Sequence, residues 1–174
     1  MHARPHFIAC QVACAAAIAC SGEEPTPEPD CVLRVSLAGG ATQTVSADSR
    51  ASCGAGSLNP TGSEMYFNLE AAPVVHRFEF RIADLHAQSA GAALATQIRL
   101  VPSLTDTTVP GWLANSCTST VDRVRVTDGD NSLTIADVTA HGICDEPASP
   151  EPGNAVGPLT VGPFEFVGIA VWNK

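Results

Sequence analysis

The sequence is poor in basic and in aromatic residues. Its 174 residues include 9 Lys and Arg against 18 Asp and Glu, and aromatic residues make up 5%, with one Tyr and two Trp. The acidic balance argues against a nucleic-acid partner and against an electrostatic hold on anionic lipids. The small number of rings argues against the multi-ring surface that carbohydrate-binding sandwiches usually display.

Motifs that carry chemistry are also missing. None of His76, His86 and His141 belongs to a His-x-x-x-His pair, no Cys-x-x-Cys knuckle is present, and Ser57 lacks the spacing of a nucleophile elbow. We interpret the three histidines as scattered surface residues. A triad of dispersed residues, such as Asp84, His86 and a serine, stays open because its members need not be close in sequence. We therefore expect a protein that is not an enzyme and has no cofactor, with a hydrolase as the third alternative.

Long apolar runs are limited to one segment near the N-terminus. Phe7 to Ala19 is apolar apart from Gln11, and Arg4 belongs to a short basic stretch before it. A transmembrane helix needs about 20 residues, whereas this shorter run has the length of a signal-peptide core. We therefore predict that residues 1–19 are an export signal and not a membrane span.

A lipid-attachment motif ends this signal. Ala17-Ile18-Ala19-Cys20 resembles the lipobox of bacterial lipoproteins, although that family usually has leucine where Ala17 stands. The resemblance implies cleavage before Cys20, a diacylglyceryl group on its thiol, an added acyl chain such as palmitate, and attachment to the cell envelope. Ser21 favours the outer membrane, by the sorting preference of enterobacteria. Ala17-Ile18-Ala19 also fits an ordinary secretory cleavage site, so a freely secreted protein is the alternative.

A short spacer separates the signal from the rest of the chain. Residues 20–30 begin with the cysteine and continue as an acidic, proline-rich stretch, which we interpret as a tether. Residues 31–174 have the length of one domain. Removal of residues 1–19 takes away Arg4 and no acidic residue, which leaves 8 basic and 18 acidic residues and a formal charge of −10. We interpret that charge as a source of solubility.

The remaining cysteines indicate an oxidising compartment. An even number of cysteines in an exported domain predicts disulfides, here two. Each predicted bridge closes a loop of more than 20 residues, and each is expected to contribute about 3–4 kcal/mol. The four residues are Cys31, Cys53, Cys117 and Cys144.

A predicted hairpin selects the pairing. Residues 121–127 and 133–140 have the composition of two strands around the turn Asp-Gly-Asp-Asn. A hairpin centred between residues 130 and 131 places Cys117 opposite Cys144, within reach of a disulfide. Cys31 is then expected to pair with Cys53.

The remaining pattern predicts an all-β protein. Apolar and polar residues alternate in several short segments, and no long segment has a helical period. We predict an antiparallel β-sandwich of about eight or nine strands, with immunoglobulin-like or jelly-roll-like topology. Residues 48–62 and 102–116 are expected to be irregular, and 83–95 to form a short helix or a crossing loop. The expected strands are 31–38, 41–47, 64–70, 74–82, 96–101, 121–127, 133–140, 159–161 and 164–172.

Two local features are candidates for ligand contacts. Asp128 and Asp130 have part of the spacing of a calcium loop, but Asn131 occupies the position of its glycine, so we favour a hairpin turn over a metal site. Trp112 follows Pro110-Gly111 and could stack on a sugar, or cover one end of the core.

These features predict a membrane-anchored lipoprotein of the bacterial envelope with a non-enzymatic domain in a structural or binding role. Its expected partners are the membrane, through the lipid on Cys20, and a protein or glycan that the sequence does not identify. A secreted or anchored module that binds a glycan or another ligand is the first alternative.

Overall fold

A computed structural model describes residues 31–39, 43–47, 53–57, 62–69, 74–106, 108–129 and 132–173. The predicted lipidation site Cys20, the signal 1–19 and the tether lie outside these residues, so the proposed domain boundaries remain predictions. The described part of the chain contains no helix long and apolar enough to cross a membrane.

Ten strands are described, and all neighbouring strands in the sheet are antiparallel. The all-β antiparallel prediction is therefore confirmed. No helix is described, and residues 83–92 form turns that lead into a strand. The strands are β1 (Val32–Gly39), β2 (Gln43–Ala47), β3 (Cys53–Ser57), β4 (Ser63–Asn68), β5 (Arg77–Ile82), β6 (Ala93–Val101), β7 (Trp112–Gly129), β8 (Leu133–Cys144), β9 (Ser149–Pro150) and β10 (Leu159–Asn173).

The strands form one continuous sheet. Its order is β2-β1-β10-β8-β7-β6-β5-β4-β3, and the short β9 pairs with β7 beside this path. The two separate sheets of a sandwich are thus not confirmed. From β3 to β8 each strand pairs with the next in sequence, as expected for chain segments joined by short connections.

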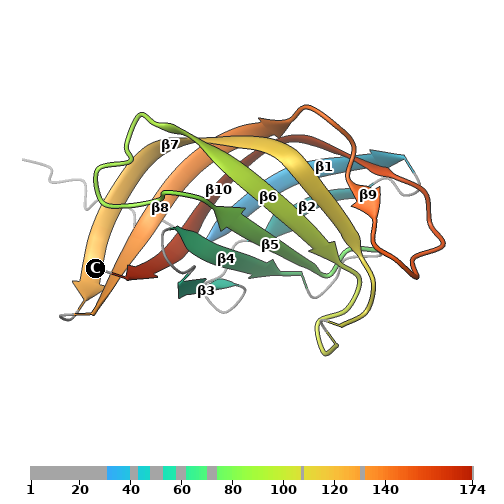
Figure 1. The fold of residues 1–174 in the computed structure, drawn as a ribbon, viewed down its shortest axis with the longest axis horizontal. Helices are drawn as coiled ribbons and strands as arrows, with labels where there is room; N and C mark the ends of the chain where they lie inside the picture. Colours follow the sequence, from blue (N-terminus) through green and yellow to red (C-terminus); the bar gives the residue numbers. More distant parts are fainter. Residues whose placement is uncertain are drawn as a thin grey trace, which may run out of the picture.

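The sheet curls so that the strands at one end of its order, β3 and β4, pack against β10, the third strand from the other end. Figure 1 shows the long strands β7, β8 and β10 arching over β3, β4 and β5. Both β3 and β4 pack against β10, and the amide of Val171 in β10 donates a 3.0 Å hydrogen bond to Oγ of Ser63 in β4. Glycine permits this approach, because a Cβ at Gly168 would lie 2.8 Å from Cζ of Phe67.

The inner face of the curled sheet holds the core. Alternation in β4 and β5 turns Met65, Phe67, Phe78 and Phe80 inward, as their spacing predicts, and all four are fully buried. The Phe80 ring lies edge-on to Phe67, with centroids 5.7 Å apart. It also contacts two rings of β10, Phe164 at 5.5 Å and Phe166 at 5.1 Å, so aromatic packing joins β4 and β5 to β10 across the curled sheet.

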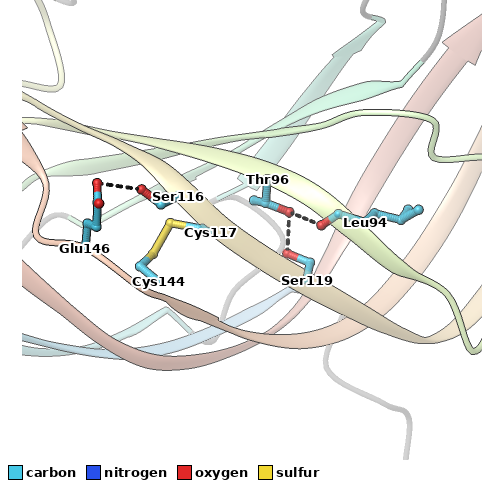
Figure 2. Close-up of a disulfide and its surroundings, with 7 residues drawn as sticks. All are labelled: Leu94, Thr96, Ser116, Cys117, Ser119, Cys144 and Glu146. Atoms are coloured by element: carbon cyan, nitrogen blue, oxygen red, sulfur yellow. Dashed lines mark hydrogen bonds between the residues drawn. A yellow bond between two sulfur atoms is a disulfide. The ribbon is translucent and has the colours of Figure 1, made fainter.

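Both predicted disulfides are present. Cys117 and Cys144 are direct cross-strand partners in β7 and β8, as Figure 2 shows. Cys31 is joined to Cys53, with the Cα atoms 6.3 Å apart, and this bridge connects the start of β1 to the edge strand β3. It therefore links the edge strand β3 covalently to the segment that leads into β1, the second strand from the other edge.

Three strands differ from the prediction. β3 lies within residues predicted as a loop, because Gly and Ala carry little strand signal and the strand is defined by pairing with β4 and packing on β10. β7 begins at Trp112, inside a predicted connection, and continues through the hairpin. β10 is one strand in place of two short segments.

Candidate functional site

Trp112 is not a surface residue. Its side chain is 2% exposed, and the indole Nε1 donates a 3.0 Å hydrogen bond to the carbonyl oxygen of Gly157. The ring belongs to the core cluster. It covers one end of the core, and the stacking interpretation loses the exposed face that it requires.

The suspected triad is a turn. Ser89 is 1% exposed, and its Oγ accepts from the amide of His86 at 3.0 Å and donates to the carbonyl oxygen of Asp84 at 3.4 Å. Nδ1 of His86 accepts from the amide of Gln88 at 3.1 Å. The hydroxyl and the imidazole are thus hydrogen-bonded to main-chain groups, and these contacts stabilise residues 84–89 without activating a nucleophile.

The candidate cation site is not assembled by the described residues. Asp128 is exposed and accepts a 2.7 Å hydrogen bond from the amide of Gly129, whereas Asp130 lies outside the described residues. In the part of the chain that the structure describes, no group of three or more His, Cys, Asp or Glu residues could hold a metal ion.

The structure assembles a different polar site on the outer face of the sheet. Arg34 in β1 lies opposite Glu165 in β10, and Glu165 lies opposite His141 in β8. An Arg34 Nη1 to Glu165 Oε1 ion pair measures 2.7 Å, and Nδ1 of His141 is 3.0 Å from Oδ2 of Asp122 in β7. We call these four residues the charged row. Each side chain is between 46% and 64% exposed.

A β-bulge completes the charged row. The register between β7 and β8 passes from Val121 opposite Ala140 to Arg123 opposite Thr139, so Asp122 is the extra residue. Bulges commonly redirect a side chain, and here Asp122 lies against the imidazole of His141. No pattern in the sequence predicts this contact, because the bulge interrupts the simple alternation.

The charged row lies between two adjoining hollows. One has a volume of about 330 Å³ and is lined by the four side chains together with Val32 and Val167. The other, of about 420 Å³, extends from Arg34 and His141 to Ile143 and Pro163. Its lining is more apolar, and Ile143 is 54% exposed. We call this combined surface the outer-face groove.

A histidine beside a carboxylate can act as an oriented base that activates a nucleophile. None of the four side chains of the charged row is a hydroxyl or a thiol, so the row itself supplies no nucleophile. Among the described residues, the only hydrogen-bond partner of the His141 ring is Asp122, and no hydroxyl or thiol is bound to the ring. The groove can instead bind a surface whose charges complement its own.

A second charged cluster holds two connections against the sheet. Arg99 in β6 donates to both carboxylate oxygens of Glu151, at 2.7 and 3.0 Å, and Glu151 accepts from the amide of Gly111 at 2.7 Å. The Arg99 guanidinium is also 3.5 Å from Glu79, which is 6% exposed. These contacts hold Gly111, which directly precedes Trp112, and the segment that begins at Glu151 against β6.

The hydrogen bonds of this cluster shift two pKa values. Hydrogen bonding from Arg99, followed by that from the amide of Gly111, holds the pKa of Glu151 below its ordinary value of 4.5 against the effect of burial. The same side-chain hydrogen bond raises the pKa of Arg99. Because both groups stay charged in the folded protein, we assign this cluster a stabilising role.

A scan against family models finds no match to this chain, and searches of the curated proteins and of the solved structures find none either.

Proposed function

We propose that the protein is a lipoprotein of the bacterial cell envelope, anchored through Cys20, with a non-enzymatic β domain in a structural or binding role. The observation that carries the proposal is the sequence Ala17-Ile18-Ala19-Cys20 directly after an apolar run of signal-peptide length. The two disulfides add support, because such bonds persist in oxidising compartments outside the cytosol.

The anchor would act through its acyl chains. Each buried methylene contributes about 0.8 kcal/mol, and a single chain binds only marginally, so stable attachment needs two or more. Lipobox processing would supply them on one residue. The predicted tether then leaves the domain about ten residues from the lipid.

The binding role is supported by the outer-face groove. It combines two hollows with exposed groups of both signs and an exposed apolar side chain, Ile143, and charges of this kind can complement those of a partner surface. With Trp112 buried, no observation favours sugar stacking.

Intact mass is the measurement that tests the anchor. The full chain is produced in a bacterial host, extracted from its membrane fraction and weighed before and after reduction. We expect a chain that starts at Cys20, carries diacylglyceryl and acyl groups, and gains four hydrogens when its two disulfides are reduced.

Two variants sharpen this test. Cys20→Ala should remove the lipid mass and release the protein from the membrane fraction, whereas Cys14→Ala, which changes a cysteine inside the signal, should leave both unchanged. An unmodified wild-type chain in the soluble fraction would overturn the anchor and favour a secreted protein.

A further inference from the structure

The order of charges in the charged row has a symmetry. Across the four neighbouring strands β1, β10, β8 and β7 it places Arg34, Glu165, His141 and Asp122. The first and last residues are a cation and an anion. The two middle residues are an anion and an imidazole, whose ring N–H can donate a hydrogen bond to a carboxylate. The row is therefore complementary to its own reversed copy.

We propose that the outer-face groove is a self-association surface and that its occupant is a second copy of this chain. The two copies pack outer face against outer face around a two-fold axis that runs parallel to the strands. Such an axis exchanges β1 with β7 and β10 with β8. Arg34 then faces Asp122 of the second copy, and Glu165 faces His141 of the second copy, twice each by symmetry.

The charges select this axis over its rival. A two-fold axis across the strands would place each strand over itself, so that Arg34 would face Arg34 and Glu165 would face Glu165. Like charges directly opposed across an interface strongly disfavour association. The axis along the strands avoids both contacts.

The residues beside the row agree with the same axis. Ile143 and Pro163 are exposed on β8 and β10, directly after His141 and before Glu165 on the same face. The exchange of β8 with β10 places Ile143 of each copy over Pro163 of the other. The most exposed large apolar side chain of the described residues thereby gains an apolar partner. Aligned sheets pack about 10 Å apart, a spacing that these side chains can fill.

The geometry also suits a tethered molecule. An axis along the strands leaves the first residue of β1, Val32, at the same end of both copies. Both tethers would then lead towards one surface. Attachment to one membrane would raise the effective concentration of the two copies. The self-association itself does not depend on the anchor.

Sedimentation velocity over a concentration series tests the proposal. The protein is the full chain carrying Cys20→Ala, so that lipid plays no part and a failure of the anchor would not affect the result. We expect a concentration-dependent dimer. Arg34→Glu should raise the dissociation constant by at least about 100-fold, because it opposes Asp122 of the second copy.

A compensating double variant distinguishes a contact between two copies of the chain from a contact within one copy. Arg34 and Asp122 are three strand spacings apart in a single chain, about 14 Å, so they do not pair internally. Arg34→Glu combined with Asp122→Arg reverses both ends of the row and should restore the dimer. Arg81→Glu, which changes an exposed arginine paired with Glu64 elsewhere on the sheet, is the matched control and should leave the dimer intact.

Three outcomes would each overturn the proposal. The first is a parent protein that is monomeric at every concentration, and the second is an Arg34→Glu variant that dimerises normally. The third is a double variant that stays monomeric while urea unfolding shows it to be folded.

Crosslinking provides a measurement that does not depend on charge. Ile143→Cys in the full chain should give a dimer with a short bis-maleimide, because the two cysteines would lie near the axis. The matched control is Ala87→Cys, an exposed position in the turns after β5, which should give none. Equal crosslinking at both positions, or none at Ile143→Cys, would contradict the proposed interface.

Discussion

Single charged residues fix the connections around the core. Glu151 receives two hydrogen bonds from Arg99 and one from the amide of Gly111, and Asn154 donates a further 2.8 Å bond to the carbonyl oxygen of Gly111. Hydrogen bonds to charged groups contribute more than neutral ones. The carboxylate of Glu151 thus holds both its own segment and the segment of Gly111 against β6.

Replacement of Glu151 by glutamine should expose this contribution. Because the folded-state pKa of Glu151 lies below 4.5, its stabilisation is present above that pH and is lost as the pH falls through the folded-state value. We expect Glu151→Gln to lower the free energy of unfolding by about 1–3 kcal/mol near neutral pH, and by less as the pH falls through the folded-state pKa of Glu151. Urea unfolding at about pH 7 and about pH 3 measures both differences.

Glu146→Gln is the control for that experiment. Glu146 is an exposed carboxylate that accepts one hydrogen bond from Ser116, so its replacement should change stability by less than about 0.5 kcal/mol at either pH. An equal loss for both variants would show that the ion pair of Glu151 with Arg99 contributes no more to stability than the exposed Glu146 does.

The indole of Trp112 contributes in a different way. Trp112→Phe keeps a buried ring and removes the hydrogen bond to Gly157. We expect a loss of about 1–3 kcal/mol, since the smaller ring also leaves unfilled volume. Thermal unfolding measures the loss, and an unchanged transition would contradict the assigned role as a cover for the core.

At the scale of elements, close approach between strands decides how the sheet curls. β10 passes β4 where Gly168 meets the side chain of Phe67, and β3 also packs against β10. The glycine at this crossing lets β10 approach the side chain of Phe67 in β4 closely.

An added methyl group at the crossing should therefore force β4 and β10 apart. Gly168→Ala would place a Cβ 2.8 Å from the buried ring of Phe67, and we expect a loss of about 1–3 kcal/mol in the free energy of unfolding. Gly56→Ala in β3, where a Cβ would meet nothing within 4 Å, should have little effect. Comparable losses in the two variants would show that the crossing is not tightly packed.

The strands with strong alternation could be predicted, and the elements defined by tertiary contacts could not. β5 was expected because Phe78, Phe80 and Ile82 alternate with charged residues. β3 has no such pattern and depends on its neighbours. The hairpin was predicted with the register that pairs Cys117 with Cys144, but two bulges in β7 shift the pairs towards its tip.

At the scale of the whole molecule, function depends on which residues the sheet brings together. Arg34 and Glu165 are separated by 131 positions in the sequence, so their contact follows from strand order and not from any local motif. The separate histidine candidates gave no reason to favour His141 over the others. The charged row was therefore missed, while the cysteine pairing, which needed only one hairpin, was found.

The bridge between Cys31 and Cys53 has a consequence for protease attack. The disulfide closes a loop of the chain between residues 31 and 53, and this loop contains Arg50, a site for trypsin-like cleavage. A cut there would divide the polypeptide yet leave the N-terminal piece covalently attached to the piece that holds β3 to β10. We expect a trypsin-nicked protein to migrate as one band without reductant and as two with it. An anchored copy damaged in this way would stay at the membrane, and only reduction of one bond would remove the covalent link.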